Sequence, residues 1–204
     1  MFVPSNRQNM ERDMTPDESL RLIESMISQA KKSFSRMSFY FLLWGVLLIG
    51  AMIATYIMRD APPGPVQGAA WGVAGLIGGI LSSIHGARQG KREPVNNPMD
   101  RVIGWLWGAF VITLLITIAC TVPHHRDPGP MITLLTGLPT FMTGQILRFR
   151  PLIIGGMLFW LAGIIMHFTD DVLLLTVLYC SAMFFGYIVP GLMLKRQENV
   201  LRPA

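Results

Sequence analysis

The chain has 204 residues, of which 51% are hydrophobic and only 14% are charged. An ordinary soluble domain has about 25% charged residues. The low charged fraction therefore excludes an ordinary soluble domain and is typical of a protein embedded in lipid. The formal net charge of +5 does not indicate nucleic acid as a partner, because no basic face interleaved with aromatic residues occurs. We expect the lipid bilayer to be the main surroundings of the chain.

Six apolar segments are each close to the 20 or so residues that a membrane-spanning helix needs. They are residues 39–58, 66–84, 102–122, 131–147, 152–168 and 172–194. The sequence therefore predicts an all-α integral membrane bundle of six transmembrane helices with an N-terminal cytoplasmic amphipathic helix. The expected divisions are a mobile tail (1–15), the amphipathic helix (16–36), the six-helix domain (37–195) and a cytoplasmic tail (196–204).

The basic residues gather on one side of this predicted topology. With the N-terminus in the cytoplasm, fifteen of the 17 lysines and arginines lie inside, and only Arg59 and Arg126 lie outside. The positive-inside rule then places both termini in the cytoplasm. The first apolar segment begins too late for a cleaved signal peptide, so we expect a retained anchor.

The first predicted helix begins with a capping box, in which Thr15 is the N-cap, Pro16 follows and Glu18 closes the box. Apolar residues then recur at spacings of three and four: Leu20, Ile23, Ile27, Ala30, Phe34 and Met37. Lys31, Lys32 and Arg36 lie next to the membrane. The helix could bind anionic head groups through these cations, or dock against a partner or a second copy. It could also pack under its own bundle or simply continue the first span into the cytoplasm.

The second span carries a stripe of small residues. It consists of Gly68, Gly72, Gly75, Gly79, Ser83, Gly86 and Gly90, which fall on one side of a helix. In lipid, small residues let a neighbouring helix approach closely. The stripe therefore predicts that this is the central helix of the bundle and that these residues are helix-packing sites.

The fourth span carries a stripe of hydroxyl groups. Thr133, Thr136, Thr140 and Thr143 share one face, with Gln145 near the inner end, and Pro139 is expected to interrupt the helix. A broken helix with free polar groups is how a transporter builds a midplane site, so the stripe is a possible polar path. The alternative is structural, because threonines often bond to the carbonyl four residues earlier.

Polar residues in two outer loops could meet outside the membrane. These are His124, His125 and Asp127, and His167, Asp170 and Asp171. Imidazoles and carboxylates bind metals, although neither spacing matches a known site, and we assign no metal ligand. Cys120 and Cys180 do not form a disulfide framework. We find no catalytic motif, no cofactor-binding motif and no titratable group in the middle of any span, which argues against an enzyme and against ion-coupled transport.

Several stretches of the chain resemble a family of small bacterial polytopic membrane proteins of unknown function. They are ESLRLIESMISQAKKSFSRMSFYFLLWG, IHGARQGK, DRVIGWLWGAF and RFRPLIIGG. The resemblance covers most of the chain and implies the architecture only, with no activity and no site residue attached.

The function that the sequence favours is a non-enzymatic scaffold or regulatory subunit of a membrane. It would bind a membrane or cytoplasmic protein, or a second copy of itself, through Leu20, Ile23, Ile27 and Phe34. The alternatives are a passive small-molecule transporter or channel-like protein that uses the threonine stripe, and a metal-binding protein that uses the outer histidines.

Overall fold

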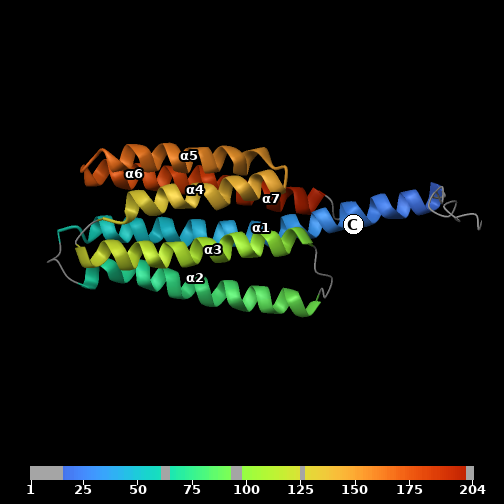
Figure 1. Cartoon of the computed structure of the whole chain (residues 1–204), viewed down its shortest axis with the longest axis horizontal. Coiled ribbons are helices and arrows are strands. Elements are labelled where there is room, and N and C mark those ends of the chain that lie inside the picture. The colour runs from blue at the N-terminus through green and yellow to red at the C-terminus, as the bar shows by residue number, and fades with distance from the viewer. Residues whose placement is uncertain (1–15, 61–64, 93–97, 125–126, 201–204) are drawn as a thin grey trace, which may run out of the picture.

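A computed structural model shows an elongated bundle of helices that run along one axis (Figure 1). It describes the backbone of residues 16–60, 65–92, 98–124 and 127–200, and within these ranges no strand occurs. Side chains are described for residues 37–60, 68–90, 99–124 and 127–196. The elements are α1 (Pro16–Ile57), α2 (Pro65–Arg92), α3 (Pro98–Thr121), the short turn η1 (Val122–His124), α4 (Gly129–Ile146), α5 (Arg150–His167), α6 (Val172–Met183), the π-helical turn η2 (Phe184–Ile188) and α7 (Val189–Val200).

Five helical segments within the described residues are long and apolar enough to cross a membrane. They are Met37–Ile57, Gly68–Gly90, Met99–His124, Arg150–His167 and Val172–Arg196. The predicted all-helical membrane architecture is thus confirmed for five spans. The remaining predicted span, 131–147, corresponds to α4, which lies alongside the others in the bundle but is not among the five. A sixth crossing therefore stays a prediction.

The first helix is one continuous element. α1 runs from Pro16 to Ile57 without a break, so its backbone does not separate an amphipathic helix from the first span. Its N-terminal part projects beyond the ends of the other helices (Figure 1). The side chains of residues 16–36, which include the predicted partner-binding positions, lie outside the described part of the chain, as does the predicted tail 1–15. At the other terminus, α7 continues to Val200, past the expected end of the helical domain at 195.

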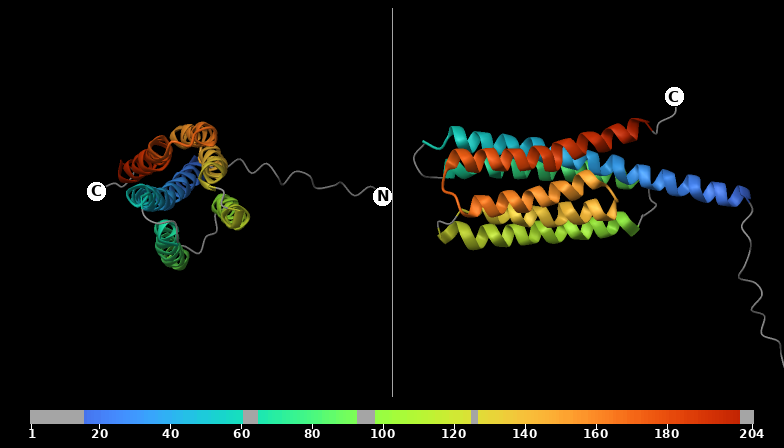
Figure 2. Two further views of the ribbon diagram at one scale, coloured as in Figure 1. Left: turned by 90° about the vertical axis from the view of Figure 1, so that its left-hand side faces the viewer. Right: turned by 90° about the horizontal axis from the view of Figure 1, so that it is seen from above.

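The bundle has a packed half and an open half. α1, α4, α5, α6 and α7 form the packed half, whereas α2 packs mainly against α1, and α3 against α4 (Figure 2, left). Only 11% of the α2 span and 6% of the α3 span are buried, against 39% for the α5 span. The central position predicted for α2 is therefore wrong, because the core forms where large side chains of five other elements meet.

The closest helix pair is the hairpin of α4 and α5, which glycines allow to approach. A Cβ atom added at Gly156 would lie 2.6 Å from Cβ and 2.7 Å from the backbone nitrogen of Phe141. One added at Gly144 would lie 2.7 Å from the backbone nitrogen of Ile153. The turn between the helices closes through Arg148, whose φ of 51° is left-handed, and through a bond of 2.8 Å from the Phe149 amide to the Gly144 carbonyl. This hairpin holds α4 in place for the site below.

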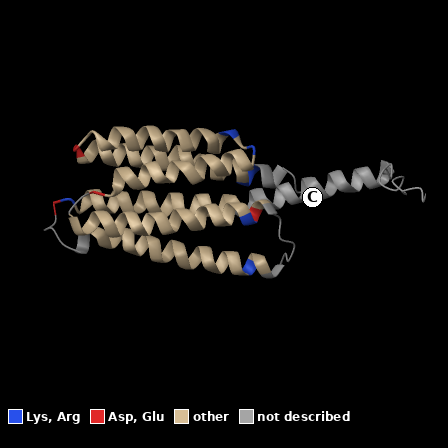
Figure 3. Ribbon diagram, viewed as in Figure 1, with Lys and Arg blue, Asp and Glu red and all other residues tan. Residues whose placement is uncertain are grey.

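Charged residues lie at the two ends of the bundle (Figure 3). At the end from which α1 projects, called here the basic end, the described charged side chains are Arg88, Asp100, Arg101, Arg148, Arg150, Lys195 and Arg196. At the opposite, acidic end they are Arg59, Asp60, Asp127, Asp170 and Asp171. Because the charges leave the middle of the bundle free, the apolar segments can lie in the hydrocarbon layer.

Candidate functional site

The threonine stripe of α4 lies in the interior of the packed half. Thr133, Thr140 and Thr143 are 0% exposed and Thr136 is 3% exposed, as the spacing of one helix face requires. The predicted interruption at Pro139 is wrong, because α4 is continuous through this buried residue. Contacts with α5 along the whole of α4, rather than local helix propensity, keep α4 helical through Pro139. Membrane helices commonly tolerate an internal proline in this way.

Three of the four hydroxyls bond to their own helix. Thr133 donates to the Gly129 carbonyl at 2.8 Å, and Thr136 donates to the Ile132 carbonyl at 2.7 Å. Thr140 donates to the Thr136 carbonyl at 2.7 Å. Each of these hydroxyls donates to the carbonyl four residues earlier in its own helix, which is the pattern of a structural threonine. Gln145 is exposed and does not share the buried face. The arrangement thus favours helix packing over the polar path.

Two aromatic side chains, the half-buried Trp107 and the buried Tyr187, bond to the half of the stripe that lies nearer the basic end. The Trp107 Nε1 atom of α3 donates to the Thr143 hydroxyl at 3.2 Å. A side-chain hydrogen bond also joins Tyr187 of η2 to Thr140. In lipid such bonds link helices because a polar group without a partner is costly there. The stripe therefore ties α3, α4 and η2 together.

Aromatic rings surround Tyr187 on three sides. The ring centroid of Tyr187 lies 5.2 Å from those of Phe41 and Phe159, and 6.4 Å from that of Trp107, all with edge-on geometry. Phe41 belongs to α1 and Phe159 to α5, and both are buried. We call Phe41, Trp107, Thr140, Thr143, Phe159 and Tyr187 the aromatic–hydroxyl cluster. It joins α1, α3, α4, α5 and η2 at one point of the core.

The π turn puts Tyr187 into this cluster. In η2 the Val189 amide bonds to the Phe184 carbonyl, five residues back. Pro190 follows at once and has no amide hydrogen to give, so an ordinary α-turn would lose a bond and place its ring against the preceding turn. The change in helix geometry that Pro190 requires thus takes the form of a wide π turn just before it. The Ser38 hydroxyl of α1 bonds to the Gly191 carbonyl at 3.0 Å and fixes the start of α7.

Replacing Tyr187 by phenylalanine removes one interhelical bond and keeps the ring. We expect the free energy of unfolding to fall by about 1 kcal/mol, the usual size of such a bond between membrane helices. Adding Thr140→Val should then cost less than it does alone, because the two side chains share the bond. Thr176→Val is the matched control, since Thr176 is buried and donates to the Val172 carbonyl of its own helix. Denaturation in mixed detergent micelles measures all four variants, and additive losses for Tyr187 and Thr140 would contradict the bond.

The small-residue stripe of α2 has no neighbouring helix along most of its length. A Cβ atom added at Gly68, Gly72, Gly75, Gly79 or Gly90 would meet nothing within 4 Å. A Cβ atom added at Gly86 would lie 3.2 Å from the Tyr40 hydroxyl, and Ser83 is exposed and donates to the Gly79 carbonyl. The close approach predicted for the stripe is therefore not made within the single chain. The residue that does admit a neighbour is Gly78, where an added Cβ atom would lie 2.8 Å from Cη2 of Trp44 of α1, while Trp44 Nε1 donates to the Ser82 hydroxyl.

The polar residues of the acidic end bond to backbone amides at the starts of helices or stand exposed. Asp127 accepts a bond from the Gly129 amide and Asp171 accepts one from the Leu173 amide, each at 2.9 Å. His124 and His167 are exposed, and His125 lies outside the described residues. Within the described part of the chain, no group of three histidine, cysteine, aspartate or glutamate side chains could hold a metal ion.

Sequence reasoning missed Trp107, Tyr187 and Phe159 as core residues. Trp107 looks like an interface anchor because it follows exposed Trp105 near the start of the span, and Tyr187 lies in an evenly apolar segment. The signal that could have found Tyr187 is Pro190, three residues later, which demands a local change in helix geometry.

No protein-family model, no curated protein and no solved structure matches this chain.

Proposed function

We propose that this multi-pass membrane protein is a non-enzymatic scaffold or interaction subunit. The proposed location is a bacterial inner membrane with both termini in the cytoplasm. The gathering of basic side chains at the end from which α1 projects supports this orientation. The single observation that carries the function is the projection of α1 beyond the bundle as one unbroken helix.

The projecting part of α1 has an apolar stripe that needs a partner. Because the helix is continuous, Leu20, Ile23, Ile27 and Phe34 fall on one side of it. A narrow stripe at spacings of three and four is the seam by which one helix packs against another. A seam that leaves the membrane domain would be exposed to water unless another helix covers it. The proposed occupant is a second protein chain, either another protein or a second copy.

The aromatic–hydroxyl cluster supports a structural role for the membrane domain. In the cluster, Thr140 donates to the Thr136 carbonyl of α4 and Thr143 accepts a bond from Trp107, while the rings fill the space between the helices. A passive transporter would need hydroxyls that turn toward a path instead. We therefore favour a domain that holds α1 rigidly over one that conducts a solute.

The test places two glutamates on the apolar seam and compares them with two on the far side. Ile23→Glu with Ile27→Glu should reduce the native mass of the protein, isolated from its own membrane in mild detergent, to that of a single 22.7-kDa chain. Ser25→Glu with Gln29→Glu adds the same charge at the same spacing about 180° away around the helix, and should retain the larger mass. A parent protein that already has the single-chain mass, or an equal result for the two double variants, would overturn the proposal.

A further inference from the structure

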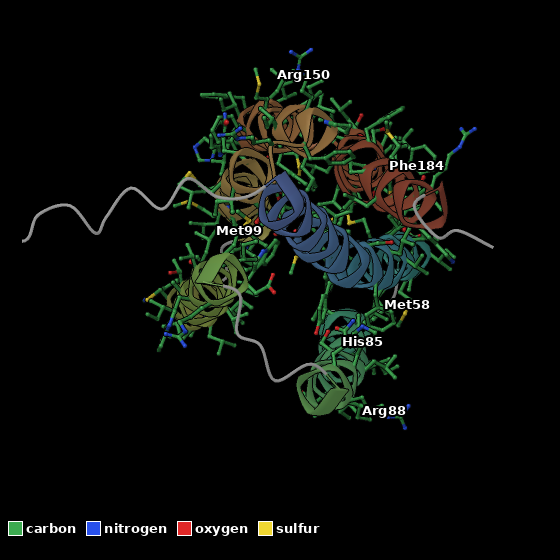
Figure 4. All side chains as sticks on the ribbon, turned by 90° about the vertical axis from the view of Figure 1, so that its right-hand side faces the viewer. Met58, His85, Arg88, Met99, Arg150 and Phe184 are labelled. Carbon is green, nitrogen blue, oxygen red and sulfur yellow. The ribbon has the colours of Figure 1, made fainter. Side chains whose placement is uncertain are left out.

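We draw no further inference here: the strongest candidate, the side of α2 that carries the small-residue stripe and lies opposite Arg88 (Figure 4), has open space at Gly68, Gly72, Gly75 and Gly79, and nothing in the described part of the chain shows what covers it.

Discussion

Replacing Gly156 by alanine should destabilise the folded protein by about 3 kcal/mol, at the upper end of what overpacking usually costs. The added methyl group would lie between 2.6 and 2.8 Å from three atoms of Phe141, two of which belong to the backbone. A backbone cannot turn aside as a side chain can, so α4 and α5 must separate along the hairpin. Separation would also loosen the threonine stripe and the two aromatic side chains bonded to it.

Two further glycines give a graded series. Gly163→Ala places its methyl group 2.7 Å from Cγ of Leu134 but 3.0 Å from the nearest backbone atom, farther than at Gly156, so we expect a smaller loss. Gly75→Ala on α2 meets nothing within 4 Å and should be neutral or stabilise the helix by up to about 1 kcal/mol. Denaturation with sodium dodecyl sulfate in mixed micelles, followed by tryptophan fluorescence, gives the free energy of unfolding for each variant.

The relative sizes of the three losses in the free energy of unfolding decide which helices are closely packed. A loss at Gly75 as large as that at Gly156 would mean that a helix covers the α2 stripe in the folded protein. Equal and small losses at all three positions would mean that α4 and α5 are not closely packed. Should Gly156→Ala fail to accumulate in the membrane, Gly163→Ala against Gly75→Ala still makes the comparison.

The glycines show why sequence alone misjudged the packing of this bundle. The spans themselves were predictable, because length and hydropathy decide what can lie in lipid. The α2 stripe offered the longest run of small residues, yet the closest approaches to the backbone of a neighbouring helix are at Gly144 and Gly156. A small residue permits a close approach but does not supply the neighbour. Here the neighbours are Ile153 and Phe141, on helices that a short turn already holds together.

The threonine stripe was predictable as a face but not in its bonds. Its spacing correctly placed four hydroxyls on one side of α4, and that side is buried. The spacing could not show that three donors turn back to their own helix, because that choice depends on side-chain rotamers. The partners Trp107 and Tyr187 come from distant elements and share no local pattern with the stripe.

Gly186→Ala should destabilise the core at the π turn by an amount comparable to the loss expected for Gly156→Ala. A Cβ atom there would lie 2.5 Å from Cε2 of Phe159, and Cα of Gly186 is itself 2.8 Å from the position of a Cβ at Gly155. The π turn is thus held between α5 and the rings of the cluster, with no room for a methyl group. We expect a loss of about 2 kcal/mol in the free energy of unfolding, as for other overpacked cores.

The clash is with a ring, so a smaller side chain at position 159 should relieve it. Phe159→Leu alone leaves a cavity and destabilises the protein, since Phe159 is fully buried. Combined with Gly186→Ala, it removes the atoms that the methyl group meets. The double variant should therefore be more stable than the two separate losses predict, by about 1 kcal/mol. Leu161→Ala in place of Phe159→Leu is the control, because Leu161 is 56% exposed on the same helix and should add its loss independently. Additive losses for Gly186→Ala and Phe159→Leu would show that the contact between these two residues does not hold Tyr187 in the cluster. The link from the π turn to α5 would then have to be abandoned.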